Sequence, residues 1–280
     1  MFPHHARGLR PIHVWIVVAV LFGFATSASA GDVTAKIDFD VQSLPKGTIV
    51  NSIQGDDGEG GMVGPVGVLG TLPGHPENRA LIFDSSLRTG GDTDLGTPNQ
   101  TFGGPGIGSG GESGQPFQND QQLFNVLIVA ENLVDANNDG LVDSPDDAHV
   151  YGMLLEFDFT SIQAPFAPEA VTVHSITTID AGDATHTAGE VRIYDDANQL
   201  IYSIDLIPGG NNGLVTQPLG TFGMGVTGAA KMIVQLNGSS ANWIAPSCCT
   251  TRPRSLRMAA SSAWVRRSAS RPGACMPVVR

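Results

Sequence analysis

The chain has 280 residues, of which 27 are acidic and 15 are basic, so its formal charge at neutral pH is −12. Residues 31–243 hold all 27 acids and only six basic residues, a charge of −21, whereas residues 244–280 hold seven arginines and no acid. So acidic a segment argues against binding to nucleic acid or anionic lipid, because phosphate groups are bound by Lys and Arg. The three cysteines all follow residue 243, so residues 31–243 are not a disulfide scaffold.

The first thirty residues are typical of a secretory signal peptide. Arg7 and Arg10 precede the apolar run Val14–Ala25, and small residues at 28–30 offer a cleavage site near Ala30. The apolar run is shorter than the roughly twenty residues that a helix needs to cross a bilayer, which favours a cleaved signal over a permanent anchor. We therefore expect a secreted or cell-surface protein, with no membrane span in the mature chain.

Residues 31–243 carry the spacing of β-strands. Apolar residues alternate with polar ones or form short runs, and clusters of Gly, Pro, Asn and Asp separate these runs. The sequence predicts an all-β domain, a single β-sandwich or jelly roll with long Gly- and Asp-rich loops, followed by a disordered C-terminal tail. The predicted strands are 34–39, 67–69, 79–83, 126–130, 152–159, 171–179, 189–194, 200–206, 214–218 and 231–236.

Two segments, a predicted hairpin and a Gly-rich connection, carry more specific sequence patterns. Residues 189–206 are predicted to form a hairpin, and the apolar side chains expected to face the core are Val191, Ile193, Ile201, Ile204 and Leu206. Residues 90–119 form a Gly-rich connection, and such long irregular segments are uncommon unless a ligand or metal orders them. Its Gly106–Gly111 stretch lacks the Lys-Ser/Thr ending of a phosphate-binding loop.

Residues 135–146 match the template of an EF-hand calcium loop. Gly140 permits the sharp turn at position six, and the apolar Val142 at position eight is expected to pin the loop to the core. The flanking residues are strand-like and Pro145 opposes an exiting helix, so we expect a structural calcium clamp between two strands. The alternative is a solvated acidic turn without an ion. The predicted ligands are Asp135, Asn137, Asp139, the carbonyl of Leu141, Asp143 and Asp146, which stands where the template has Glu.

A second, weaker calcium site is predicted at Asp84, Asp92 and Asp94, beside glycines that let carbonyl groups approach a cation. The alternative here is again a solvated turn. The histidines of the mature chain stand apart in the sequence without metal-ligand spacing, and they are His75, His149, His174 and His186.

No catalytic residues are predicted. The chain lacks a Gly-x-Ser-x-Gly elbow and a His-Glu-x-x-His zinc motif. Paired carboxylates for glycoside hydrolysis stay open, because such pairs meet in space and acids are plentiful. Few aromatic residues are available to stack on sugar rings.

Several motifs together carry a resemblance: IDFDVQSLPKGTIV, ALIFDSSLRTGGDTDLGTPN, GPGIGSGGESG, NVLIVAEN with DANNDGLVDSPDD, and VTVHSITTID through KMIVQLNGSSA. Over nearly all of residues 35–241 the chain resembles uncharacterised secreted bacterial β-sandwich proteins of the PEP-CTERM-exported kind. Their fold is similar to that of carbohydrate-binding jelly rolls. The resemblance implies export, a sandwich and calcium, and it carries no settled activity.

The basic tail, residues 244–280, departs from that pattern. Its Arg, Ser, Ala and Cys bias is what an out-of-frame reading of GC-rich DNA gives, and we hypothesise a frameshift near Asn242. The alternatives are a genuine tail that docks on the acidic domain or an arm that binds a polyanion.

Two classes of function follow for the domain at 31–243. The first is a non-catalytic calcium-binding protein with a structural, adhesive or glycan-binding role, whose partner would be extracellular polysaccharide or other cell-surface material. The second is a secreted, calcium-stabilised polysaccharide hydrolase or an accessory domain of one.

Overall fold

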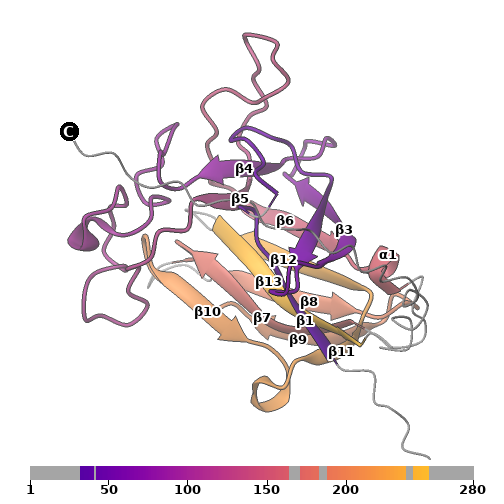
Figure 1. Ribbon diagram of the computed structural model, residues 1–280. Coiled ribbons are helices and arrows are strands. Elements are labelled where there is room, and N and C mark those ends of the chain that lie inside the picture. The colour runs from indigo at the N-terminus through magenta and orange to yellow at the C-terminus, as the bar shows by residue number, and fades with distance from the viewer. Residues whose placement is uncertain (1–31, 41, 164–170, 183–187, 238–241, 252–280) are drawn as a thin grey trace, which may run out of the picture.

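The structure, a computed structural model, describes residues 32–40, 42–163, 171–182, 188–237 and 242–251 (Figure 1). The strands are β1 (Asp32–Ile37), β2 (Ser52–Asp56), β3 (Met62–Thr71), β4 (Ala80–Asp84), β5 (Asn125–Val129), β6 (Tyr151–Asp158), β7 (Val171–Ile179), β8 (Gly189–Tyr194), β9 (Leu200–Asp205), β10 (Leu214–Pro218), β11 (Val226–Ala229), β12 (Lys231–Asn237) and β13 (Asn242–Thr251). The short helical segments are η1 (Gln100–Phe102), α1 (Thr160–Gln163) and η2 (Thr221–Gly223).

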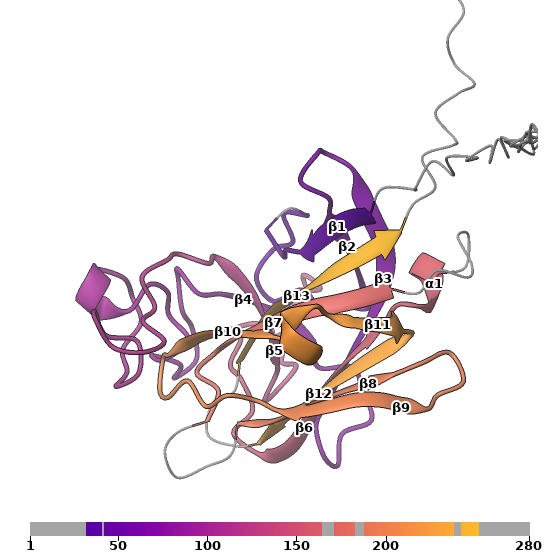
Figure 2. The ribbon, with the colours of Figure 1, turned by 90° about the horizontal axis from the view of Figure 1, so that it is seen from below.

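The prediction of an all-β fold is confirmed. The strand pairs are antiparallel, and the strands join in the order β10-β7-β13-β1-β2-β3-β6-β12-β8-β9, with β11 beside β7 and the β4–β5 pair beside β13. Figure 2 shows that this sheet curls, so that β6, β12, β8 and β9 lie on one side of the molecule and β7, β10 and β13 on the other. The two sides enclose the core as the layers of a sandwich.

The strand pattern explains the core. In β12 the side chains of Met232, Val234 and Leu236 are buried and alternate with half-buried residues, which is the period of a strand with one face inward. In β5 the consecutive residues Leu127 and Ile128 are both fully buried. Because consecutive side chains point to opposite faces, β5 is covered on both faces.

The predicted hairpin forms, with one correction. β8 pairs with β9, and Leu206 and Ile204 pack against the core, but Ile201 is 40% exposed. The register shifts between Ile193 and Tyr194, so Ile201 is the extra residue of a bulge, and the prediction that it faces the core is wrong.

β13 extends the sheet past the charge break at residue 243. Its residues 247–251 pair with β1, and its residues 242–249 pair with β7, so it joins the two strands. The first eight residues of the basic tail therefore lie in the sheet. Residues 252–280 and the predicted signal peptide at 1–30 lie outside the described residues.

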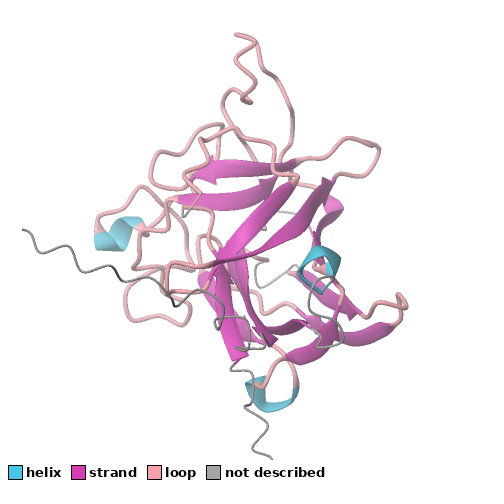
Figure 3. Ribbon diagram, turned by 45° about the vertical axis from the view of Figure 1, so that its right-hand side comes forward, coloured by secondary structure: helices cyan, strands magenta, loops and turns pink. Residues whose placement is uncertain are grey.

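Long irregular segments join several of the strands. Figure 3 shows that irregular segments leave one end of the sheet around β4 and β5. They include the Gly-rich connection between β4 and β5 and the segment between β5 and β6. Within the described part of the chain, no helix has the length and apolar composition that a membrane crossing requires.

Candidate metal site

The candidate site lies in the segment that joins β5 to β6. Two backbone hydrogen bonds close this segment at its base: Glu131 N–H donates to the carbonyl of Asp146 (3.0 Å), and Ala148 N–H donates to that of Val129 (2.9 Å). The residues between form a loop that leaves the sheet and returns beside its starting point. Asp146 therefore lies at the base of the loop and the preceding acids lie farther out.

The outer part, which we call the EF-like loop (residues 135–143), is shaped by its own polar side chains. The carboxylate of Asp135 accepts hydrogen bonds from the N–H groups of Asp139 (3.1 Å) and Gly140 (2.9 Å). The Nδ2 of Asn137 lies between the carboxylates of Asp139 (3.0 Å) and Asp143 (3.5 Å). Four predicted ligands thus lie on one loop, whose residues 136–140 are exposed.

Val142 pins this loop to the domain. Its side chain is buried, and its N–H donates to the carbonyl of Gly47 (2.9 Å). Gly47 has a φ of +87°, and a Cβ there would lie 2.5 Å from the carbonyl oxygen of Val142, so only glycine permits this approach. Leu141, whose carbonyl is the predicted ligand at position seven, is half-buried beside it.

Asp146, predicted at position twelve, belongs to a different group. We define the acidic cluster as Asp92, Asp146, Asp147 and His149, whose ligand atoms all lie within 4.8 Å of one another. Among the described residues, the acidic cluster is the group that meets this spacing. The carboxylates of Asp135, Asp139 and Asp143 do not all lie within 4.8 Å of one another.

Backbone contacts hold the cluster together. Asp147 N–H donates to Asp92 Oδ2 (3.0 Å), and Gly91 N–H donates to Asp146 Oδ2 (3.1 Å). The Nε2 of His149 lies 3.7 Å from Asp147 Oδ1 and 3.9 Å from Asp92 Oδ1. The Gly-rich connection supplies Asp92, and the approach to β6 supplies the other three members.

Burial makes this concentration of negative charge unfavourable without a cation. The side chains of Asp92 and Asp147 are each 1% exposed, whereas that of His149 is 51% exposed. Burial raises the pKa of Asp92 to about 11, and the charge of Asp147 and the carboxyl of Asp146 add to this rise. Asp146 Oδ1 is buried and accepts no hydrogen bond. A bound cation would compensate the carboxylates that solvent does not reach.

The cluster can therefore hold a metal ion. Its three carboxylates offer hard oxygen atoms, and His149 offers an imidazole nitrogen from the solvent side. Carboxylate oxygens suit Ca²⁺, Mg²⁺ and Mn²⁺, while imidazole is a ligand of Zn²⁺ and other transition metals. Asp92 and Asp147 are buried and Asp146 is half-buried, whereas His149 is exposed.

The structure does not bring Asp84, Asp92 and Asp94 together as the second predicted site. Asp84, at the end of β4, accepts hydrogen bonds from the N–H (2.9 Å) and hydroxyl (2.6 Å) of Ser86. Asp94 lies against Asn211 (3.4 Å), and Asp92 joins the acidic cluster instead. The Gly turns between these acids direct them to different neighbours.

The sequence analysis missed His149 and gave Asp147 no role. A usable signal was present, because Asp147 and His149 are two residues apart, so an extended backbone places them on one face. Their meeting with Asp92 depends on a contact 55 residues distant in the chain, which sequence spacing does not reveal.

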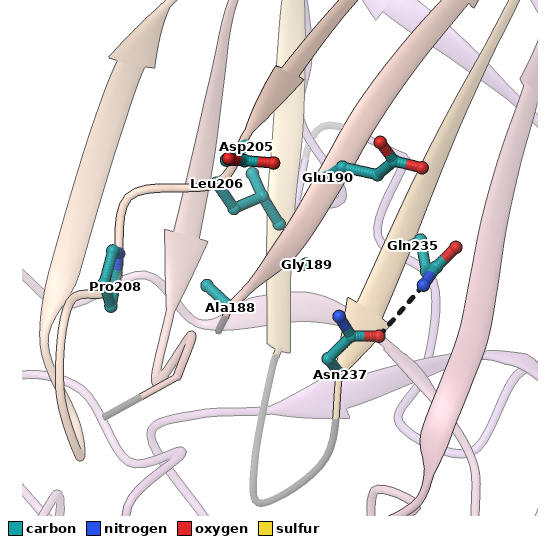
Figure 4. A pocket seen from close by; sticks show the side chains of 8 residues that line it. All are labelled: Ala188, Gly189, Glu190, Asp205, Leu206, Pro208, Gln235 and Asn237. Atoms are coloured by element: carbon teal, nitrogen blue, oxygen red, sulfur yellow. Dashed lines mark hydrogen bonds between the residues drawn. The ribbon is translucent and has the colours of Figure 1, made fainter. Parts of the chain in front are cut away.

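A separate cavity of about 350 Å³ lies where β8 begins and where β9 and β12 end (Figure 4). Glu190 and Asp205 line it, together with the amides of Gln235 and Asn237, which are joined by a hydrogen bond of 3.0 Å. Among the described residues that line it, none is aromatic.

Comparison of the chain with protein-family models, with curated proteins and with solved structures finds no match.

Proposed function

We propose that this chain is an exported, non-catalytic calcium-binding protein in which the ion stabilises the loops at one end of a β-sandwich. The observation that carries the proposal is the acidic cluster, in which Asp92 and Asp147 are almost fully buried within 4.8 Å of Asp146. Buried like charges at this spacing are unfavourable unless a proton or a cation neutralises them, and a cation binds several carboxylates at once.

Calcium fits this site better than the alternatives. Its usual coordination uses six to eight oxygen ligands in flexible geometry, and carboxylates, backbone carbonyls and water supply them. Zinc prefers nitrogen and sulfur ligands, and only the half-exposed His149 offers nitrogen. An exported protein also meets calcium at concentrations near the 0.1–1 mM dissociation constants that are roughly typical of extracellular modules.

The EF-like loop is proposed as a second, weaker calcium site. Its ligands would be Asp135, Asn137, Asp139, the carbonyl of Leu141 and Asp143, without Asp146. The Nδ2 of Asn137 lies between two carboxylates, and rotation of the amide would turn its oxygen to a cation in that place. Because this loop is more exposed than the acidic cluster, we expect it to bind more weakly.

The location and the partner are also proposals. The signal-like segment supports secretion or surface attachment, and the charge of −21 over residues 31–243 supports an environment rich in cations. A polysaccharide or other cell-surface partner is supported only by the resemblance to secreted β-sandwich proteins.

Titration calorimetry of the mature chain with CaCl₂, MgCl₂ and ZnCl₂ tests this function. We expect two calcium sites of unequal affinity. Asp92→Asn combined with Asp147→Asn should remove the tighter site, and Asp135→Ala combined with Asp139→Ala should remove the weaker one. Asp196→Asn, an exposed acid in the β8–β9 turn, is the matched control. Absence of calcium binding to the wild-type chain, or preference for zinc, would refute the proposal.

A further inference from the structure

The acidic cluster joins two segments that are far apart in sequence. Thr89 Oγ1 donates to the carbonyl of Pro145 (3.0 Å), and Gly91 N–H donates to Asp146 (3.1 Å). Gly90 packs so closely that a Cβ would lie 2.3 Å from Asp146 Cγ. Residues 89–92, which we call the latch segment, are therefore docked on residues 145–147, and Asp92 is the acid that they bring to the cluster.

The rest of the Gly-rich connection is held by different residues. Asn212, which is fully buried, donates through Nδ2 to the carbonyls of Asp94 (2.6 Å) and Gly96 (2.7 Å) and accepts from Asn99 Nδ2 (2.7 Å). Its own carbonyl accepts from Asn119 Nδ2 (3.2 Å). These bonds are neutral and contain no member of the acidic cluster, so they do not depend on a cation.

We infer that a divalent cation in the acidic cluster locks the latch segment onto residues 145–147, and that its removal opens this segment while Asn212 keeps the rest of the connection docked. The inference rests on the proposed function, and it adds that the ion controls access to one defined stretch of chain. Without the ion, the latch segment keeps only its hydrogen bonds to residues 145–147 and loses the bonds that a cation makes to carboxylates of both segments.

The chain contains a reporter for this opening. Arg88 directly precedes the latch segment, so trypsin cleavage between Arg88 and Thr89 requires residues on both sides to leave their contacts. Glu112 lies in the part held by Asn212 and is cut by a Glu-specific protease. Arg192 and Lys231 lie in β8 and β12 and report unfolding of the whole domain.

Limited proteolysis of the full chain, with CaCl₂ or with EGTA, tests the latch. Cleavage at Arg88 should be roughly 10- to 100-fold slower in about 10 mM calcium, the factor expected for dissociation constants of about 0.1–1 mM. Cleavage at Glu112 should be unchanged, and Arg192 and Lys231 should stay uncut under both conditions. A short unstructured substrate peptide controls for effects of calcium on the proteases.

The variant Asp92→Asn separates loss of the ion from general loss of structure. Its amide oxygen can still accept from Asp147 N–H, but it lacks the charge that binds the ion, so cleavage at Arg88 should not respond to calcium and should match that of the wild-type chain in EGTA. If calorimetry shows calcium binding but Arg88 is cut equally with and without calcium, the latch is wrong and the proposed function stands. If EGTA exposes Arg88, Arg192 and Lys231 together, the domain unfolds as a whole and the latch is also wrong. Absence of calcium binding would overturn both.

Discussion

At the scale of single residues, Asn212 holds more of the loop structure than any acidic residue that the sequence highlights. All its side-chain polar groups are used, its N–H donates to Asp180 (2.8 Å), and its φ of 63° lies in the left-handed region that Asn tolerates. In the sequence it is one residue of an ordinary turn, PGGNNG, and nothing there separates it from Asn211.

We expect Asn212→Ala to lower the free energy of unfolding by about 3 kcal/mol, because it leaves buried carbonyls and an amide without partners and places Ala at positive φ. Asn211→Ala is the matched control: Asn211 is exposed and its hydrogen bond to Asp94 is long (3.4 Å), so the change should stay within about 0.5 kcal/mol. Urea denaturation of both variants measures the difference. Equal losses of unfolding free energy in the two variants would show that the buried hydrogen bonds of Asn212 do not order the Gly-rich connection.

The calcium motif shows how far residue spacing alone can predict a site. Positions one to nine of the template lie on one loop as expected, because local turns and backbone geometry determine them. Asp146, at position twelve, lies in the acidic cluster instead, because the chain turns back toward β5 beyond Ser144, which has a positive φ of 47°. Its partner Asp92 comes from another loop, and a local template contains no information on that contact.

At the scale of elements, strands whose apolar and polar residues alternate clearly could be predicted from the sequence. Strands that form mainly because neighbouring strands pair with them could not. β7, β8 and β10 have the predicted bounds, and the other predicted strands overlap observed ones. β2 (SIQGD) and β11 (VTGA) were missed because Gly and Asp are poor strand formers. These two strands form because neighbouring strands supply hydrogen-bond partners.

β13 leads to a test of the domain boundary. It joins β1 to β7, so its loss would leave both strands unpaired on one side. A chain that ends after Thr251 should keep the melting temperature of the full chain. One that ends after Ala241 should lose cooperative thermal unfolding, measured by calorimetry. Should the shorter chain melt like the full one, the fold would end at the charge break, and residues 244–251 would have no part in it.

At the scale of the whole molecule, the acidic charge has two separable effects on stability. The general one is repulsion across a segment with a charge of −21, which any salt screens. The specific one is the concentration of buried carboxylates at the acidic cluster, which screening scarcely reaches because Asp92 and Asp147 are closed to solvent. Sodium and calcium chloride at one ionic strength therefore separate the two effects.

We expect about 10 mM CaCl₂ to stabilise the wild-type chain by about 1.4–2.7 kcal/mol more than about 30 mM NaCl, which has the same ionic strength. For a domain of this size, that difference corresponds to a rise in melting temperature of roughly 3–10 °C. In the chain with Asp92→Asn and Asp147→Asn, most of the calcium-specific part should disappear while the response to sodium remains. If both salts raise the melting temperature equally in the wild-type chain, calcium acts on this protein only by screening, and the acidic cluster is not an ion-binding site.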